Sequence, residues 1–336
     1  MEIKLADFSH KLELLEIWRE AFGDDEDYIL SFLNAYLLPE YNAPVIIADG
    51  KIVSVLYLVE FELYADMKVI GNCAYLFAAA TREAYRGRGY MGELIKYAIQ
   101  LYKNRGISAI FLFPQEGDEK LFKYYEKFGF KSIYQTKKIQ GCSCRPLSQK
   151  PLKGCKPSAD GGESCTLTDF RLVNHELNNV EIFDGLYQSY VEFTAKQNLS
   201  PLKDRLFYFK CASSYLDTPE KHFGVFEREL YNSTENNVEK FCYVFYKKFE
   251  NNYYIDDIIM AEYNEMRGNK LNFNETAELL ADFILNSGED IRLEMNILPE
   301  SFENNKLAMI LGLNEKVNNI IENLKSPVYL NMFMNI

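Results

Sequence analysis

The sequence is poor in histidine and has no long apolar run. Only three histidines occur among 336 residues, and His10, His175 and His222 all stand apart from any acid or nucleophile motif. They are therefore expected to be ordinary surface or core residues. The longest apolar stretch, residues 73–80, is far too short to span a bilayer. The N-terminal segment lacks the apolar core of a signal peptide, so we expect a cytoplasmic protein with no membrane partner.

Cysteine is present without the spacing of a metal site. Four of the seven cysteines gather at Cys142, Cys144, Cys155 and Cys165, and their separations match no compact zinc motif. We therefore expect no metal. In a cytoplasmic protein the cysteines are expected to be thiols rather than disulfides.

Positive charge is also scarce. The net charge is -12, and residues 151–336 carry -11 of it. Such acidity argues against nucleic acid as a partner and suits a cationic small molecule or a peptide amine as substrate. The chain exceeds the usual size of a single core, so two domains are expected. The sequence gives no indication of the oligomeric state.

The first half of the chain alternates helices and strands in the pattern of an α/β (α+β) fold with a mixed central sheet flanked by helices. From Gly141 to Cys165 the composition changes to Cys, Pro, Gly, Ser and Lys, which is typical of a linker. Helices are expected within 10–36 and over 91–105 and 118–128, and strands over 43–49, 52–64, 72–81, 108–113 and 129–139.

The second half repeats this order of elements. Tyr75 precedes Gly129-Phe130 by 54 residues, and Tyr254 precedes Gly312-Leu313 by 58. Two divergent copies of one fold are therefore expected. Here helices are predicted over 181–197, 201–216, 274–287 and 302–311, and strands over 221–227, 241–250, 252–263 and 290–298.

The run "YRGRGYMG" contains a glycine motif, G-x-G-x-x-G, at Gly87, Gly89 and Gly92. A dinucleotide site needs a strand that runs directly into the first glycine, and an acid at the end of the next strand. Here "TREAYR" precedes the glycines, and the next strand closes with Pro114-Gln115. Both tests for a dinucleotide fold fail.

Two motifs carry a resemblance to a known family. "YRGRGYM" resembles the acyl-CoA pyrophosphate loop of the GCN5-related N-acetyltransferase (GNAT) superfamily: Arg86 and Gly89 match, and Met91 stands where Gly or Ala is usual. "YEKFGF" at residues 125–130 resembles the later Tyr-x-x-x-Gly-Phe motif. The resemblance implies a GNAT acetyltransferase domain at 1–140 with the acyl-CoA N-acyltransferase fold, a linker at 141–165, and a degenerate GNAT-like domain at 166–336. This tandem layout is similar to that of the enhanced intracellular survival acetyltransferases.

The resemblance also implies acetyl-CoA as co-substrate and a set of residues that contact it. The backbone of Ala79 and Thr81 would contact the pantetheine arm, and Arg86 and Arg88 would supply positive charge. A solvated turn that caps a helix is the alternative explanation for the loop, and close strand packing is the alternative for residues 78–80. Backbone N–H groups at the helix start would hold the pyrophosphate, from Gly87, Arg88, Gly89, Tyr90 and Met91.

Tyr125 is the predicted general acid for the departing thiolate, since it matches the tyrosine of the later motif. A phenol has an ordinary pKa of about 10, against about 8.5 for a thiol. A core aromatic side chain is the alternative interpretation. The nearby Asp118 is expected to cap the helix start.

The general base is left open among Glu116, Glu83 and a carboxylate that acts through water. In the enhanced intracellular survival relatives the terminal carboxylate reaches the active site, and the resemblance suggests that role for Ile336.

The predicted function is transfer of an acetyl group from acetyl-CoA to an amine by direct attack. The alternative is a GNAT fold that binds acyl-CoA as a sensor without turnover. A transferase that uses aminoacyl-tRNA fits poorly, because an acidic chain repels tRNA. The amine acceptor is not identified by the sequence.

Overall fold

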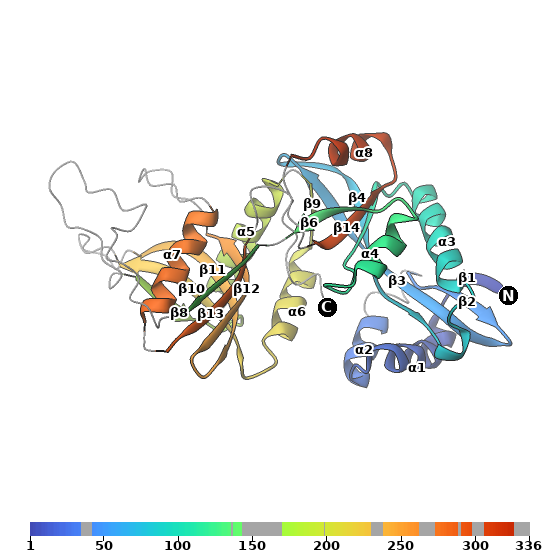
Figure 1. Ribbon diagram of the computed structural model, residues 1–336, viewed down its shortest axis with the longest axis horizontal. Helices are drawn as coiled ribbons and strands as arrows, with labels where there is room; N and C mark the ends of the chain where they lie inside the picture. Colours follow the sequence, from blue (N-terminus) through green and yellow to red (C-terminus); the bar gives the residue numbers. More distant parts are fainter. Residues whose placement is uncertain are drawn as a thin grey trace. The chain divides into compact units, whose positions relative to one another are not determined.

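The computed structural model describes residues 1–34, 42–135, 137–142, 170–197, 199–229, 238–261, 273–287, 290–297 and 306–325. The chain divides into two compact units (Figure 1). The first combines Met1–Tyr134 with Lys306–Leu324, and the second combines Gln135–Asn305 with Lys325–Ile336.

The first unit is a mixed sheet with helices on both faces. Its strands follow the order β1-β2-β3-β4-β5-β14-β6. β4 and β5 are parallel, and β14 is antiparallel to β5. The elements are β1 (Glu2–Leu5), η1 (Phe8–His10), α1 (Lys11–Phe22), α2 (Glu26–Phe32), β2 (Pro44–Ala48), β3 (Lys51–Ala65), β4 (Lys68–Thr81), η3 (Glu83–Tyr85), α3 (Tyr90–Asn104), β5 (Ala109–Leu112), α4 (Glu119–Glu126), β6 (Lys131–Gln135), β14 (Lys306–Gly312) and α8 (Glu315–Glu322).

Alternation along the central strands separates the two faces of this sheet. Leu56 and Leu76 pack in one apolar cluster with Leu94 of α3 and Phe122 of α4. On the other face lie aromatic rings, with the centroid of Trp18 in α1 4.9 Å from that of Tyr57. Because side chains alternate across a strand, one sheet buries α3 and α4 on one side and α1 on the other.

The second unit repeats the same strand pattern. Its sheet has the order β7-β13-β12-β11-β10-β8, with β12 parallel to β13 and β7 antiparallel to β13. The elements are β7 (Lys137–Cys142), β8 (Phe170–Asn174), α5 (Val180–Ala195), β9 (Ser200–Leu202), α6 (Arg205–Tyr215), β10 (Lys221–Glu229), β11 (Val238–Phe249), β12 (Asn252–Met260), α7 (Phe273–Asn286) and β13 (Arg292–Ile297).

Each half of the chain supplies a strand to the sheet of the other half. β7 follows β6 directly in the chain but pairs with β13 of the second sheet. β14 follows β13 in the chain but pairs with β5 of the first sheet. In each sheet the exchanged strand is antiparallel to the second strand of the parallel pair. Neither half of the chain therefore contains all the strands of its own sheet.

The exchange corrects two expectations. The helix predicted over 302–311 is wrong, because Lys306–Gly312 is the strand β14. Residues 307–310 are buried throughout, and a short run that is apolar on both faces lacks the periodicity that separates helix from strand. The single strand predicted over 129–139 is also wrong, because β6 and β7 belong to different sheets.

Other sequence expectations concern cysteine, metal and membrane. Cys73, Cys211 and Cys242 are free thiols. For Cys142 the expectation of a thiol is wrong, because this residue is disulfide-bonded. No helix in the described part of the chain is long and apolar enough to cross a bilayer. Among the same residues, no three His, Cys, Asp or Glu side chains gather as metal ligands would.

A fragment of residues 1–140 is expected not to fold alone, although it holds every predicted site residue except Ile336. It lacks β14, so β5 and β6 each lose a partner strand and Met309 is missing from the core. Circular dichroism and solubility of the isolated fragment test this. Co-expression with residues 141–336 should restore soluble protein, whereas a native-like melting transition of the fragment alone would contradict the exchange.

Candidate active site

β4 separates from β5 at the C-terminal ends of the two strands. Their ladder stops at Leu76 opposite Leu112, whereas β4 continues to pair with β3 as far as Thr81. Just past this point Ala78 and Ala79 together lie opposite Leu56, which makes a β-bulge, and Ala78 has a φ of 44°. A bulge changes the direction of a strand. β4 therefore turns away from β5 at the point where its own side chains, those of Ala78 and Ala79, are small.

The glycine loop follows at once and leads into α3. Gly87 and Gly89 have φ values of 75° and 81°, which favour glycine, and a Cβ at either would meet nothing within 4 Å. No side chain caps α3, whose first backbone bond runs from Glu93 N to Gly89 O. The start of a 15-residue helix is therefore open to an anion. The predicted helix start at 91 is within one residue of Tyr90.

The two predicted arginines differ in their contacts. Arg86 Nε donates to Thr81 O at 3.1 Å, which fixes the guanidinium beside the end of β4. Arg88 donates to Ala84 O at 3.0 Å and lies over the ring of Tyr85 at 4.9 Å. Both side chains are exposed. Thr81 O, a predicted cofactor contact, is thus already an acceptor for Arg86. Ala79, Tyr90 and Met91 are half-buried against the core cluster.

Tyr125 lies on α4, the helix that follows β5, and is 7% exposed. Its ring packs against those of Tyr124 and Phe130, at centroid distances of 5.5 and 5.9 Å. Burial, with a smaller contribution from Tyr124, raises the pKa of Tyr125 to about 12. Its hydroxyl has no hydrogen-bond partner among the described residues. Tyr125 thus belongs to the same cluster as Leu76 and Leu112, the last pair before the strands diverge.

The carboxylates near the site are less constrained. Asp118 is the N-cap of α4 as predicted, since its side chain accepts from the N–H groups of Lys120 and Leu121. Glu116 and Glu83 are both exposed. Ile336 lies outside the described residues. The identity of a general base stays a prediction.

Arg82 is a site residue that the sequence reasoning missed. Its Nε donates to Ile52 O at 2.9 Å, and its guanidinium bonds Glu20 at 3.0 Å and Glu16 at 3.2 Å on α1. Glu20 also accepts the N–H of Glu83 at 2.9 Å. The side chain is 19% exposed. Arg82 therefore ties the junction between β4 and the glycine loop to α1. In two of these three side-chain contacts of Arg82 the partner is more than 60 positions away, so no local motif marks the residue.

Replacement of Arg82 by Met is expected to raise the KM for acetyl-CoA by about tenfold with a smaller effect on kcat, because the loop loses its anchor while the reacting groups remain. Steady-state kinetics in both substrates measure this split. Arg19→Met is the control, since Arg19 pairs with Glu26 on the surface of α1–α2. An unchanged KM in the Arg82 variant would show that the loop is held without this residue.

The diverging parallel strands, the open helix start and the buried tyrosine all belong to the first unit. Residues 2–133 match the acetyltransferase (GNAT) domain family. This part of the chain belongs to the GNAT superfamily, which uses acetyl-CoA as co-substrate and comprises acyl-CoA-dependent N-acyltransferases.

Solved structures share the fold over nearly the whole chain. A probable N-acyltransferase of Enterococcus faecalis has 12% identity and a TM-score of 0.65, with 93% of this chain and 72% of that chain covered. A GCN5-related N-acetyltransferase of Anabaena variabilis has 13% identity and a TM-score of 0.62, covering 93% and 73%. Eis1 of Mycobacterium abscessus has 10% identity and a TM-score of 0.61, covering 94% and 75%. At such identities the likeness is one of fold. No curated protein is similar enough in sequence to match.

Proposed function

We propose that the first unit transfers an acetyl group from acetyl-CoA to an amine. The observation that carries the proposal is the open, uncapped start of α3 beside the divergence of β4 and β5. Gly87 and Gly89 leave space for a pyrophosphate, and the helix dipole favours its charge. Ala78 and Ala79 leave room for a narrow pantetheine arm beside β4. Arg86 and Arg88 add positive charge to the glycine loop.

The reaction needs one bond to form and one to break. The amine nitrogen attacks the thioester carbonyl, the new N–C bond replaces the C–S bond, and the thiolate leaves. The nitrogen must lose a proton to a base, for which Glu116 and Glu83 are the proposed side chains. The sulfur must gain hydrogen-bond support or a proton, and Tyr125 is the proposed donor.

The raised pKa of Tyr125 determines how its hydroxyl can assist the departure of the thiolate. At a pKa of about 12 the phenol stays protonated throughout the physiological range. Full transfer to a thiolate of pKa about 8.5 is then uphill by about 4–5 kcal/mol. Hydrogen-bond donation to the charge that develops on sulfur, with proton transfer late in C–S cleavage, is the form of assistance that this environment favours.

The second unit is proposed to bind no acetyl-CoA. Its parallel ladder ends at Ile255 opposite Met295, and a bulge follows at Asp256, the same sequence of features as in β4. The small alanines are replaced there by carboxylates. Asp256 accepts from Tyr215 Oη at 2.7 Å and pairs with Lys247 Nζ at 3.0 Å. The paired side chains of Asp256, Tyr215 and Lys247 leave less room for a cofactor arm at this bulge than Ala78 and Ala79 leave at the bulge of β4.

Calorimetric titration is expected to give one acetyl-CoA site per chain. The double variant Arg86→Ala, Gly89→Val should abolish binding, because it removes the charge and places a β-branched residue at a positive φ. Gly106→Val is the matched control: Gly106 has a φ of 80° at the other end of α3 and is equally open. Two sites per chain, or unchanged affinity in the double variant, would place the cofactor elsewhere.

Tyr125→Phe is expected to lower kcat by about 10²–10⁴-fold with little change in affinity for acetyl-CoA. Tyr124→Phe on the neighbouring face is the control. Because Tyr125 ionises only near pH 12, the wild-type rate should show no alkaline loss from this group up to about pH 10. Turnover within a factor of about two in the Tyr125 variant would assign the residue to packing, and no turnover with any amine would favour a binding module.

A further inference from the structure

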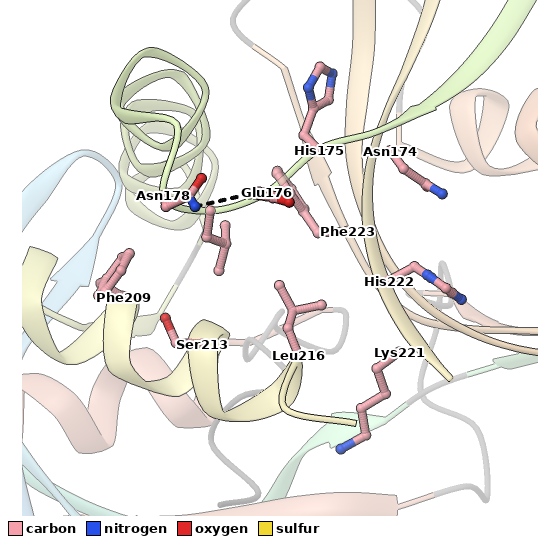
Figure 2. Close-up of a pocket in the computed structure, with 11 residues that line it drawn as sticks. Asn174, His175, Glu176, Asn178, Phe209, Ser213, Leu216, Lys221, His222 and Phe223 are labelled. Carbon is pink, nitrogen blue, oxygen red and sulfur yellow. Dashed lines mark hydrogen bonds between the residues drawn. The ribbon is translucent and has the colours of Figure 1, made fainter. Parts of the chain in front are cut away.

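The second unit contains an open cavity of about 390 Å³ that is lined by none of the residues proposed above for acetyl transfer (Figure 2). Its floor is apolar. Phe209 and Ser213 of α6 and Leu216, the C-cap of this helix, form one stripe at positions i, i+4 and i+7, and Phe223 of β10 closes the floor. These three stripe residues are only half-buried. A stripe of half-buried side chains that lines a cavity leaves apolar surface for a ligand.

Two opposite charges lie at the rim of this floor. Glu176 comes from the connection between β8 and α5, and its Oε2 accepts from Asn178 Nδ2 at 2.9 Å. Lys221 comes from the start of β10, and its Nζ lies 4.8 Å from the ring centroid of Tyr215. Neither charge forms an ion pair with another described side chain. Each keeps hydrogen-bonding capacity that a ligand can use.

The combination of these charges selects the class of ligand. An anion would satisfy Lys221 but face the Glu176 carboxylate, and a cation would face the Lys221 ammonium. A zwitterion pairs with both, and charge-assisted hydrogen bonds are the stronger kind. We propose that this cavity binds a small zwitterion with an apolar side chain, either a free amino acid or a dipeptide. Its ammonium group contacts Glu176, its carboxylate contacts Lys221, and its side chain rests on Phe209 and Leu216.

A neighbouring cavity of about 400 Å³ gives the side chain room. It shares Leu177, Asn178 and Phe209 with the first cavity and is lined mainly by apolar groups. Val180 and Leu206 at its edge are 68% and 62% exposed. Burial of such surface by an apolar side chain is favourable at about 25 cal/mol per Å². An aliphatic or aromatic zwitterion therefore fits better than a polar one.

Calorimetry on the full chain tests the proposal with L-leucine and L-leucyl-L-leucine as probes. One of them should bind at a single site, and which one binds distinguishes a free amino acid from a peptide. N-acetyl-L-leucine lacks the ammonium group and L-leucinamide lacks the carboxylate, so each should bind at least tenfold more weakly. Glu176→Gln and Lys221→Met should each weaken binding by at least tenfold, and Ser213→Trp, which fills the cavity, should abolish it.

Matched controls keep the outcome clear. Glu278→Gln and Lys196→Met change exposed charges of the same unit outside the cavity and should bind as the wild type does. Glu176→Gln should keep the wild-type rate of acetyl-CoA turnover, which separates this site from an acceptor site in the first unit. No binding of either zwitterion up to about 10 mM overturns the proposal. Equal binding of the blocked analogues, or wild-type affinity in folded Glu176 and Lys221 variants, also overturns it.

Discussion

The divergence of two parallel strands is the constraint on which the rest of the active site depends. Parallel strands normally continue to share hydrogen bonds, but the bulge at Ala78-Ala79 turns β4 away after its last pair with β5. The backbone of β4 past this point keeps a partner on the β3 side. After this turn the chain reaches α1, where Arg82 bonds Glu16 and Glu20, and it then continues into the glycine loop. The helix that follows β5 brings Tyr125 to the same end of the sheet.

The same geometry occurs twice in the chain with different side chains. In each unit the parallel ladder ends just before a bulge in the first strand of the parallel pair, β4 or β12. In the first unit the bulge is occupied by alanines and the loop beyond it by glycines. In the second it carries Asp256, which is engaged with a tyrosine and a lysine. The backbone pattern is retained in both units, and the side chains at the bulge differ between them.

The sequence predicts local features well and long-range ones poorly. The strand ending at Thr81, the start of α3 and the cap at Asp118 follow from patterns within a few residues, and each lies within one residue of its expected position. β14 and Arg82 depend on contacts with residues far along the chain. The buried apolar run at residues 307–310 is too short and too uniform to show a helix or strand period, and the sequence does not show whether an arginine contacts water or a carboxylate such as Glu20. Tertiary context alone supplies that information.

The exchange of β7 and β14 has a consequence for how the protein folds during its synthesis. A ribosome releases the chain from its N-terminus, and most domains fold as soon as their own residues emerge. Here the sheet of the first unit cannot be completed until β14 is synthesised, roughly 170 residues after β6. Until then β5 and β6 present open edges, the kind of surface that pairs with other nascent chains. A premature stop between Phe130 and Lys306 is therefore expected to remove activity, although both motifs of the first half have been translated.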